Sequence, residues 1–447
     1  MVTGGTSITA FSASSSTTNY SNIFFTFNNL TFTQGVNNVV GCFSFYSDIV
    51  VNGTLTFNTP SGVSRHGLVS EIDGNPIKIY ANAISGLQNV DFKDIIGSGS
   101  ATWSGTKLGN ISGNSGITFD APKTVYFSNN PANSTHYNTD NCWALTSGGT
   151  PNTNNFPLPQ DTIIIDDNSV SSGGTFIFSN NYSYNKLILT NRTTALTISI
   201  STTLLCNDLI VPSNVTMSST GQGLIFNAAY GKKISISGNF GTSIVAFYGL
   251  GSIKLLSDCT FRSLAILCSL LELNNYTLNA FAINNSNFNP IITSINTNTT
   301  RTIDFSTNSV INVTGNNTTV WTDSNYSINS INALRAKGNS TVNFTYSGST
   351  GTRTISASGV AFAGNSIDST LTVDAGAFNF NITAGTDSIT TGSAFVCKNL
   401  DFTGFSGTFV KSTAPTYIFG DLTLSSGMTF TGFTSTTTVV TVFVSPN

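Results

Sequence analysis

Short strand-length runs separated by turn residues are the feature that most limits what this chain can fold into. Typical examples are DIVVNGTLTFN at 48–58, NKLILTN at 185–191 and KKISISGN at 232–239. Each run is rich in β-branched or long aliphatic residues and is bounded by Asn, Asp or Gly, as is usual for β-strands. The sequence has no capped amphipathic helix pattern, and INALRAKGN at 331–339 predicts one helical turn at most. We therefore predict an all-β protein.

Loose internal repeats indicate how these strands are arranged. LTF at 30–32 recurs 25 positions later at 55–57, and LDF at 400–402 is followed 22 positions later by LTL at 422–424. An aliphatic-Asp-Phe tripeptide also recurs, with its acidic residues at Asp91, Asp304 and Asp401. Spacings of this size are typical of a β-solenoid, in which each coil stacks only on its neighbours. We predict parallel β-helix or β-solenoid-like repeats in an elongated chain; the alternatives are a β-sandwich array and chance recurrence in a biased composition.

The low charge of the chain fits stacked coils and excludes several classes of function. Charged residues are 8% of the sequence, against about 25% in typical soluble domains. Like charges on successive coils would repel, whereas stacked Asn side chains can share hydrogen bonds. Hydrophobic residues are 39%, with 33 Phe, which is ample for a core and argues against disorder. The net charge of −3 and the absence of a basic cluster argue against nucleic-acid binding.

The spacing of the strand-like runs divides the chain into three parts. Residues 123–160 break the strand pattern with a polar, loop-rich stretch, and evenly spaced strand-like runs stand on both sides of it. We predict an N-terminal β-rich, solenoid-like domain at 1–122, a non-repetitive loop-rich connecting or capping segment at 123–160, and a C-terminal β-solenoid domain at 161–447. No segment approaches the roughly 20 consecutive apolar residues of a membrane-spanning helix, so we expect no membrane insertion.

Four residues around the end of the loop-rich segment are predicted to have structural roles. Trp143 is expected to anchor the segment by packing. In PLPQDTIIIDDNS, Pro157 and Pro159 keep the chain extended and are expected to blunt an exposed sheet edge, because proline has no ladder donor. Asp161 is expected to turn the chain into a strand that begins at Thr162.

The residues from 104 to 169 carry a resemblance to a known class of proteins. SGTKLGNISGNSGITFDAPKTVYF at 104–127 and the following order W…SGG…PLPQD-x-III-D resemble a segment of predicted tail-fibre or virion structural proteins of tailed bacteriophages with β-solenoid repeats. They are also similar to passenger segments of autotransporter-like adhesins. The similarity spans about residues 86–170. It implies an elongated module attached to a virion or a cell surface, and it brings no catalytic residues with it.

The N-terminal sequence bears on where such a protein is made. The first 20 residues contain no Lys or Arg and no compact apolar stretch, so we expect no secretory signal. A surface rich in Ser, Thr, Asn and Gly is nevertheless typical of proteins that face the environment. Virion proteins satisfy both conditions, because they are made in the host cytoplasm without a signal peptide and are released by lysis. The expected location is the virion surface.

We therefore predict a structural component of a tailed-phage virion, a tail fibre or another projecting appendage that contributes to attachment to the host surface. Its expected partners are other virion proteins and host cell-surface glycans. The alternatives are a bacterial surface adhesin and a polysaccharide depolymerase. A homotrimer and a single-chain solenoid are both compatible with the sequence, which has no heptad or triple-helix pattern.

Three aromatic residues are the candidates for contact with a glycan, because an exposed ring can stack on a sugar. Trp321 lies in NNTTVWTDSNYS among polar turn residues, with Tyr326 close by, and Trp103 in SATWSG is the second choice. The alternative is that either Trp is buried, which is the commoner fate of this residue.

No catalytic or metal-binding pattern stands out. Asp166 and Asp167 are adjacent, so on a strand they point to opposite faces and cannot form a glycosidase carboxylate pair. His66 and His136 are the two histidines, and neither is accompanied by a nucleophile signal. Six scattered cysteines lack metal-ligand spacing and predict small buried thiols. We predict no enzyme, no cofactor and no metal, with a site assembled from distant coils as the alternative.

Overall fold

The computed structural model describes residues 25–33, 40–58, 65–128, 141–178, 182–201, 203–219, 223–284, 301–316, 318–322, 334–357, 378–392, 395–412, 416–418, 420–431 and 441–443. Strands dominate these residues, and their one helical element is the short 3-10 helix Thr153–Asn155. Where the register of a strand pair is defined, the pair is parallel, except for the antiparallel pair β10–β11. The predicted all-β class is therefore confirmed. The described residues fall into two compact units, one up to Tyr230 and one from Gly231 onward.

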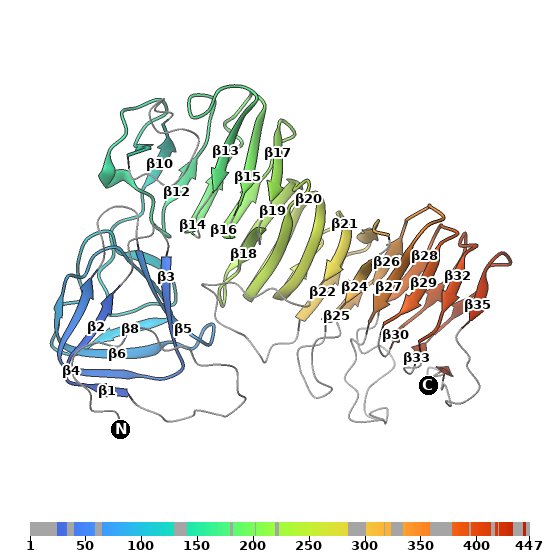
Figure 1. Cartoon of the computed structure of the whole chain (residues 1–447), viewed down its shortest axis with the longest axis horizontal. Helices are drawn as coiled ribbons and strands as arrows, with labels where there is room; N and C mark the ends of the chain where they lie inside the picture. The colour runs from blue at the N-terminus through green and yellow to red at the C-terminus, as the bar shows by residue number, and fades with distance from the viewer. Residues whose placement is uncertain are drawn as a thin grey trace. The chain divides into compact units, whose positions relative to one another are not determined.

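The first unit begins with two parallel sheets (Figure 1). One is formed by β1 (Phe25–Phe27), β2 (Leu30–Thr33), β4 (Ile49–Asn58), β6 (Ile77–Ser85) and β8 (Ile95–Ser98). The other is formed by β3 (Val40–Phe45), β5 (Arg65–Ser70), β7 (Val90–Lys93) and β9 (Gly109–Ser112).

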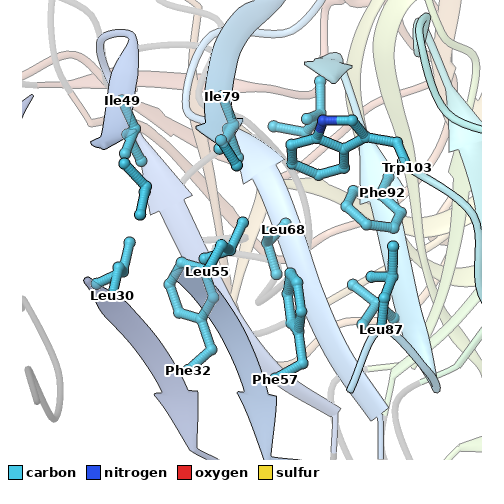
Figure 2. Close-up of a cluster of buried hydrophobic side chains, with 14 of the residues drawn as sticks. Leu30, Phe32, Ile49, Leu55, Phe57, Leu68, Ile79, Leu87, Phe92 and Trp103 are labelled. Atoms are coloured by element: carbon cyan, nitrogen blue, oxygen red, sulfur yellow. The ribbon is translucent and has the colours of Figure 1, made fainter. Parts of the chain in front are cut away.

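A hydrophobic core joins these two sheets and explains the repeated LTF tripeptide. Leu30 is in register with Leu55, and Phe32 with Phe57. The two Phe rings lie 5.6 Å apart, centroid to centroid, and Figure 2 shows all four side chains in one cluster with Leu68. The period of 25 positions seen in the sequence is therefore the offset between two neighbouring parallel strands.

The same unit continues with two further sets of parallel strands. One set contains β10 (Thr124–Phe127), β12 (Thr162–Ile164), β14 (Tyr182–Ile188), β16 (Thr203–Ile210) and β18 (Gly223–Asn227), with β11 (Trp143–Ala144) beside β10. The other contains β13 (Gly174–Phe178), β15 (Leu196–Ile200) and β17 (Val215–Ser219). A strand begins at Thr162, as the sequence predicted.

The predicted loop-rich segment 123–160 also contains regular structure. β10 pairs with β12 in parallel, Thr124 beside Thr162, so the segment carries a strand of the following sheet. Trp143 is fully buried, and its ring lies 5.5 Å from that of Phe127, centroid to centroid. These contacts give Trp143 the packing position that a structural anchor needs.

Asp161 is buried at the turn that leads into β12. Its Oδ1 accepts a hydrogen bond from the Lys123 backbone N–H at 2.9 Å, and its Oδ2 accepts one from the Leu158 N–H at 2.8 Å. The Lys123 Nζ lies 3.1 Å from the same Oδ2. A carboxylate that satisfies two backbone donors and one ammonium holds this turn together.

The prediction that Pro157 and Pro159 protect an exposed sheet edge is wrong, because both residues are buried. A Cβ at Gly109 would collide with the ring of Pro159, which shows how closely this loop packs on β9. Gln160 continues the contact, because its Oε1 accepts a hydrogen bond from the Asn110 N–H at 2.8 Å. The prolines therefore help to dock the loop on the preceding sheet.

The second unit is a long succession of strands (Figure 1, yellow to red). They are β19 (Lys233–Asn239), β20 (Ile244–Glu272), β21 (Thr277–Asn284), β22 (Arg301–Phe305), β23 (Val310–Val313), β24 (Thr319–Thr322), β25 (Leu334–Gly338), β26 (Thr341–Phe344), β27 (Thr352–Ser356), β28 (Asn379–Ile382), β29 (Ser388–Thr391), β30 (Phe395–Cys397), β31 (Leu400–Asp401), β32 (Thr408–Val410), β33 (Thr416–Ile418), β34 (Leu422–Thr423), β35 (Thr429–Thr431) and β36 (Thr441–Phe443).

Most of these strands pair in parallel with a strand two or three places further along the chain. The longest series runs β21–β23–β26–β28–β31–β34. Ile311, Val342 and Phe380 are in register on three of these strands and are fully buried. Leu400 is in register with Leu422, so the second repeat noted in the sequence also marks neighbouring strands.

Candidate functional site

A row of asparagines crosses successive strands of the second unit. Asn279, Asn312, Asn343 and Asn381 occupy the same register position on β21, β23, β26 and β28. The Nδ2 of each later residue donates to the Oδ1 of the one before it, at 3.0, 3.1 and 3.1 Å. We call this row the asparagine ladder. Amides suit it because each is both donor and acceptor and carries no charge to repel its neighbour.

A hollow of about 520 Å³ lies at the β21 end of the asparagine ladder. Its lining comes from β20 and β21 and from the segments beside them, and consists of Gly241, Thr242, Thr260, Phe261, Arg262, Asn279, Ala280, Phe281 and Thr314. We call this hollow the Phe281 groove.

Strand alternation places the polar groups of the groove. Thr260 and Asn279 are in register on adjacent strands, and both point away from the core side chains that precede them. Phe281 follows Asn279 by two residues, so it shares the outward face, and its side chain is 40% exposed. Thr314 is fixed beside them because its backbone N–H donates to the Ala280 carbonyl at 2.9 Å.

The groove carries groups that are able to contact a saccharide. Phe281 offers an exposed ring face, and the surrounding threonines and Asn279 offer hydroxyl and amide groups for sugar hydroxyls. Arg262 is exposed, and it is the one charged residue in the lining, which contains no carboxylate. A groove with a single guanidinium and no acid favours an anionic ligand over a neutral one.

The tryptophans predicted to bind glycans are buried. Trp321 has no exposed surface, and its ring centroid lies 5.1 Å from that of Phe378 and 5.5 Å from that of Phe380. Trp103 is 5% exposed, and its Nε1 donates to the Ser98 carbonyl at 2.9 Å. Burial excludes both indoles as surface stacking platforms, and the alternative of a buried Trp holds. Tyr326 lies outside the described residues.

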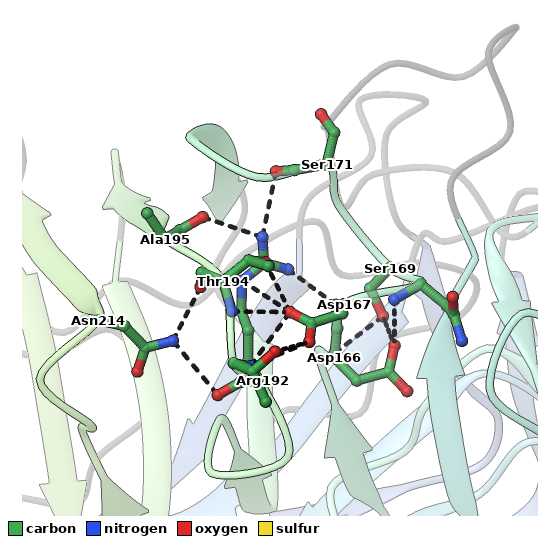
Figure 3. Close-up of polar contacts among 10 residues, drawn as sticks. Asp166, Asp167, Ser169, Ser171, Arg192, Thr194, Ala195 and Asn214 are labelled. Atoms are coloured by element: carbon green, nitrogen blue, oxygen red, sulfur yellow. Dashed lines mark hydrogen bonds and ion pairs between the residues drawn. The ribbon is translucent and has the colours of Figure 1, made fainter.

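Asp166 and Asp167 belong to a turn and do not form a catalytic pair (Figure 3). The hydroxyls and backbone N–H groups of Thr193 and Thr194 all donate to the Asp167 carboxylate. These hydrogen bonds hold the pKa of Asp167 well below its usual range. The Asp166 Oδ1 accepts a hydrogen bond from the Ser169 hydroxyl at 3.0 Å, so Asp166 closes its own turn while Asp167 binds the turn at Thr193 and Thr194.

Arg192 ties the same turn to its neighbours. Its guanidinium donates to the carbonyls of Asp166 at 2.8 Å, Ala195 at 3.0 Å and Ser171 at 3.1 Å. The side chain is buried, and burial lowers its pKa. A buried arginine that satisfies several backbone carbonyls has a structural role.

The acids of the repeated tripeptide also make structural contacts. Asp91 pairs with Arg65 in the first unit, with both side chains buried. The Asp304 carboxylate lies 2.7 Å from the Nζ of Lys337, its register partner on the next strand. The third acid, Asp401, accepts hydrogen bonds within its own turn. Each acid therefore stabilises a strand pair or a turn.

The remaining candidate groups are the histidines and the cysteines. His66 is buried, and His136 lies outside the described residues. Cys206, Cys259, Cys268 and Cys397 are free and buried, and Cys142 is buried, as predicted; the side chain of Cys42 lies outside the described residues. Among the described residues no group of three or more His, Cys, Asp or Glu is placed to hold a metal ion.

Comparison with protein families, with curated proteins and with solved structures gives no match for this chain. A search of the described residues finds no helix that is long and apolar enough to cross a membrane. The function must therefore be argued from the architecture and from the Phe281 groove.

Proposed function

We propose that this chain is a non-enzymatic structural protein in which the successive parallel strands are coils of a β-solenoid. The observation that carries the proposal is the unbroken series of in-register parallel pairs in the second unit, from β21 through β34. Each coil in such a stack contacts only its neighbours, so length is gained by adding coils.

The asparagine ladder supports a mechanical role. Its hydrogen bonds run from coil to coil, parallel to the backbone hydrogen bonds of the sheet. The amides of the ladder carry no charge, so salt does not screen the contacts that they make between neighbouring coils. These properties suit a rigid appendage that stands in the external medium.

We propose that the appendage belongs to the virion of a tailed bacteriophage, as a tail fibre or a similar projection, and that it contributes to attachment to the host surface. The Phe281 groove supplies a surface for attachment, because an exposed ring, several hydroxyl and amide groups and one guanidinium suit an acidic cell-surface glycan. A bacterial surface adhesin with the same coils is the alternative.

The location of the protein separates these two functions. Antibodies raised against the chain would be used to label lysates of the producing culture with gold for electron microscopy. The proposal predicts label on phage particles, at the tail or on a head projection. Label on cell envelopes with none on particles would contradict the virion assignment and favour the adhesin.

A further inference from the structure

A lysine and an aspartate lie in close contact inside the first unit. The Lys93 Nζ is 2.6 Å from the Asp73 Oδ1, and the two side chains are 0% and 1% exposed. Lys93 ends β7, and Asp73 lies in the turn that follows β5. Removing both charges from water is costly, and a buried ion pair recovers that cost only with excellent geometry and further hydrogen bonds.

A second carboxyl group is held beside this pair. Asp94 follows Lys93 directly and has a left-handed backbone with φ of 54°, which turns its side chain out of the strand direction. Its Oδ2 accepts a hydrogen bond from the N–H of Gly74, the residue after Asp73, at 3.0 Å. A Cβ at Gly113 would collide with the Asp94 Oδ1, so this carboxyl is packed in place.

The surroundings of Asp94 favour the protonated, neutral form of its carboxyl group over the carboxylate. Burial raises its pKa, the Lys93 ammonium and the Gly74 N–H oppose this shift, and the nearby Asp73 carboxylate adds to it. The site therefore brings together an amine, a carboxyl carbon and a neighbouring carboxyl that is biased toward its protonated form.

We propose that Lys93 and Asp73 join in an intramolecular isopeptide bond, formed spontaneously after folding with Asp94 as the proton-transfer residue. The folded chain holds the Lys93 Nζ 2.6 Å from the Asp73 Oδ1, which replaces a bimolecular encounter by an intramolecular one.

The reaction is balanced within these three residues. A proton moves from the Lys93 ammonium to the Asp73 carboxylate, which gives a neutral amine and a neutral acid. The Nζ lone pair attacks the Asp73 Cγ, while the Asp94 carboxyl donates its proton to the Asp73 carbonyl oxygen and stabilises the tetrahedral intermediate. A proton from Nζ then restores Asp94. The C–OH bond breaks as the second hydroxyl passes its proton to the leaving oxygen, so the amide carbonyl forms and one water molecule leaves. No oxidant, reductant or cofactor takes part.

The bond would staple the first unit where its two sheets connect. Asp73 precedes β6 of one sheet, and Lys93 ends β7 of the other, so the cross-link would close the chain between them into a covalent loop. Such a closure reduces the freedom of the unfolded chain, as a disulfide does, but it resists reduction. The ion pair of Arg65 and Asp91 on the same sheet remains non-covalent and serves as an internal contrast.

The intact mass of the full chain tests the proposal directly. We expect the purified wild-type protein to be lighter than its sequence by one water molecule, and a protease digest to yield one branched peptide containing Lys93 and Asp73. Lys93→Arg and Asp73→Ala should each restore the full sequence mass, and Asp94→Asn should slow or abolish the loss. Lys337→Arg, at an exposed ion pair in the second unit, is the control and should keep it.

The wild-type measurement is decisive even when a variant fails to fold. A folded wild-type chain with its full sequence mass, and with Lys93 and Asp73 recovered in separate unmodified peptides, would overturn the proposal. Loss of water at another position, with Lys93 unmodified, would overturn it equally.

Discussion

His66 shows what burial among aromatic side chains does to a titratable group. The imidazole is buried, with its ring centroid 5.8 Å from that of Phe43 and 6.2 Å from that of Phe57. Burial lowers its pKa from 6.5 to about 4. The folded protein thus keeps this side chain neutral at a pH where the unfolded chain protonates it.

Acid should therefore weaken the first unit through this residue. As pH falls from about 6.5 toward 4, the unfolded chain takes up a proton that the folded chain does not, so the free energy of unfolding falls by up to about 3 kcal/mol. Urea unfolding at pH 7 and pH 4.5 measures this loss. In His66→Phe the loss should shrink by the imidazole contribution, and an equal loss in both proteins would contradict the assignment.

The buried thiols give a second prediction at this scale. Burial raises the pKa of Cys206, Cys259 and Cys268 to about 12. Since the thiolate is the reactive form, these residues should resist a thiol reagent at pH 8 in the folded protein and react at once in denaturant. Peptide mapping after alkylation identifies them, and rapid native labelling of any of the three would show that the burial is wrong.

Phe281 and Trp321 show when the alternation of side chains along a strand predicts the exposure of an aromatic residue and when it does not. Phe281 lies in LNAFAIN, where alternation places it on the same outward face as Asn279, so the sequence carried a signal for an exposed aromatic that was not used. Trp321 gave no such signal, because Val320, Trp321 and Thr322 are all buried and the strand has no solvent-facing side to read.

At the scale of strands, the asparagine ladder makes a prediction about stability. Asn343 donates to Asn312 and accepts from Asn381, so Asn343→Ala removes two hydrogen bonds and leaves both neighbours unsatisfied. We expect a loss of about 1–2 kcal/mol in the free energy of unfolding. Chemical denaturation measures it, with Asn308→Ala in an exposed turn as the control. Equal effects of the two substitutions would show that the ladder contributes nothing.

The Phe281 groove makes a prediction about binding. Phe281→Ala removes the stacking surface, and Arg262→Gln removes the one charge of the lining, so each should weaken binding of an acidic polysaccharide such as polygalacturonate by about tenfold. Neutral dextran should bind more weakly than polygalacturonate to the wild type. Phe430→Ala, at another exposed ring of the second unit, is the control. Unchanged binding by both variants would show that the Phe281 groove is not the attachment surface.

Strand pairing was partly readable from the sequence. The offsets of LTF and of LDF with LTL correspond to real strand pairs, because identical residues were stacked at the same core position. β10 was missed because its strand lies inside a polar stretch, and its partner β12 is 38 positions further along, as the Lys123–Asp161 bond shows. Short strands that owe their pairing to distant partners leave little local pattern.

At the scale of the whole molecule, the charged residues are few, but several of them form buried ion pairs that join distant parts of the chain. Buried ion pairs such as Arg65–Asp91 and Arg353–Asp387 join positions 26 and 34 residues apart. No local pattern predicts such pairs, because each partner is an isolated charge in a strand or turn. The predicted boundaries after residues 122 and 160 stay predictions, while the contacts divide the described residues after Tyr230.

An electron cryomicroscopy map of the purified full chain is the most direct test of the proposed solenoid. The account predicts that β21, β23, β26 and β28 appear as adjacent parallel strands about 4.8 Å apart, one per coil, with the asparagine ladder running across them. The same map counts the chains in the particle. Antiparallel pairing of these strands, or their separation into different sheets, would contradict the solenoid and with it the appendage that we propose.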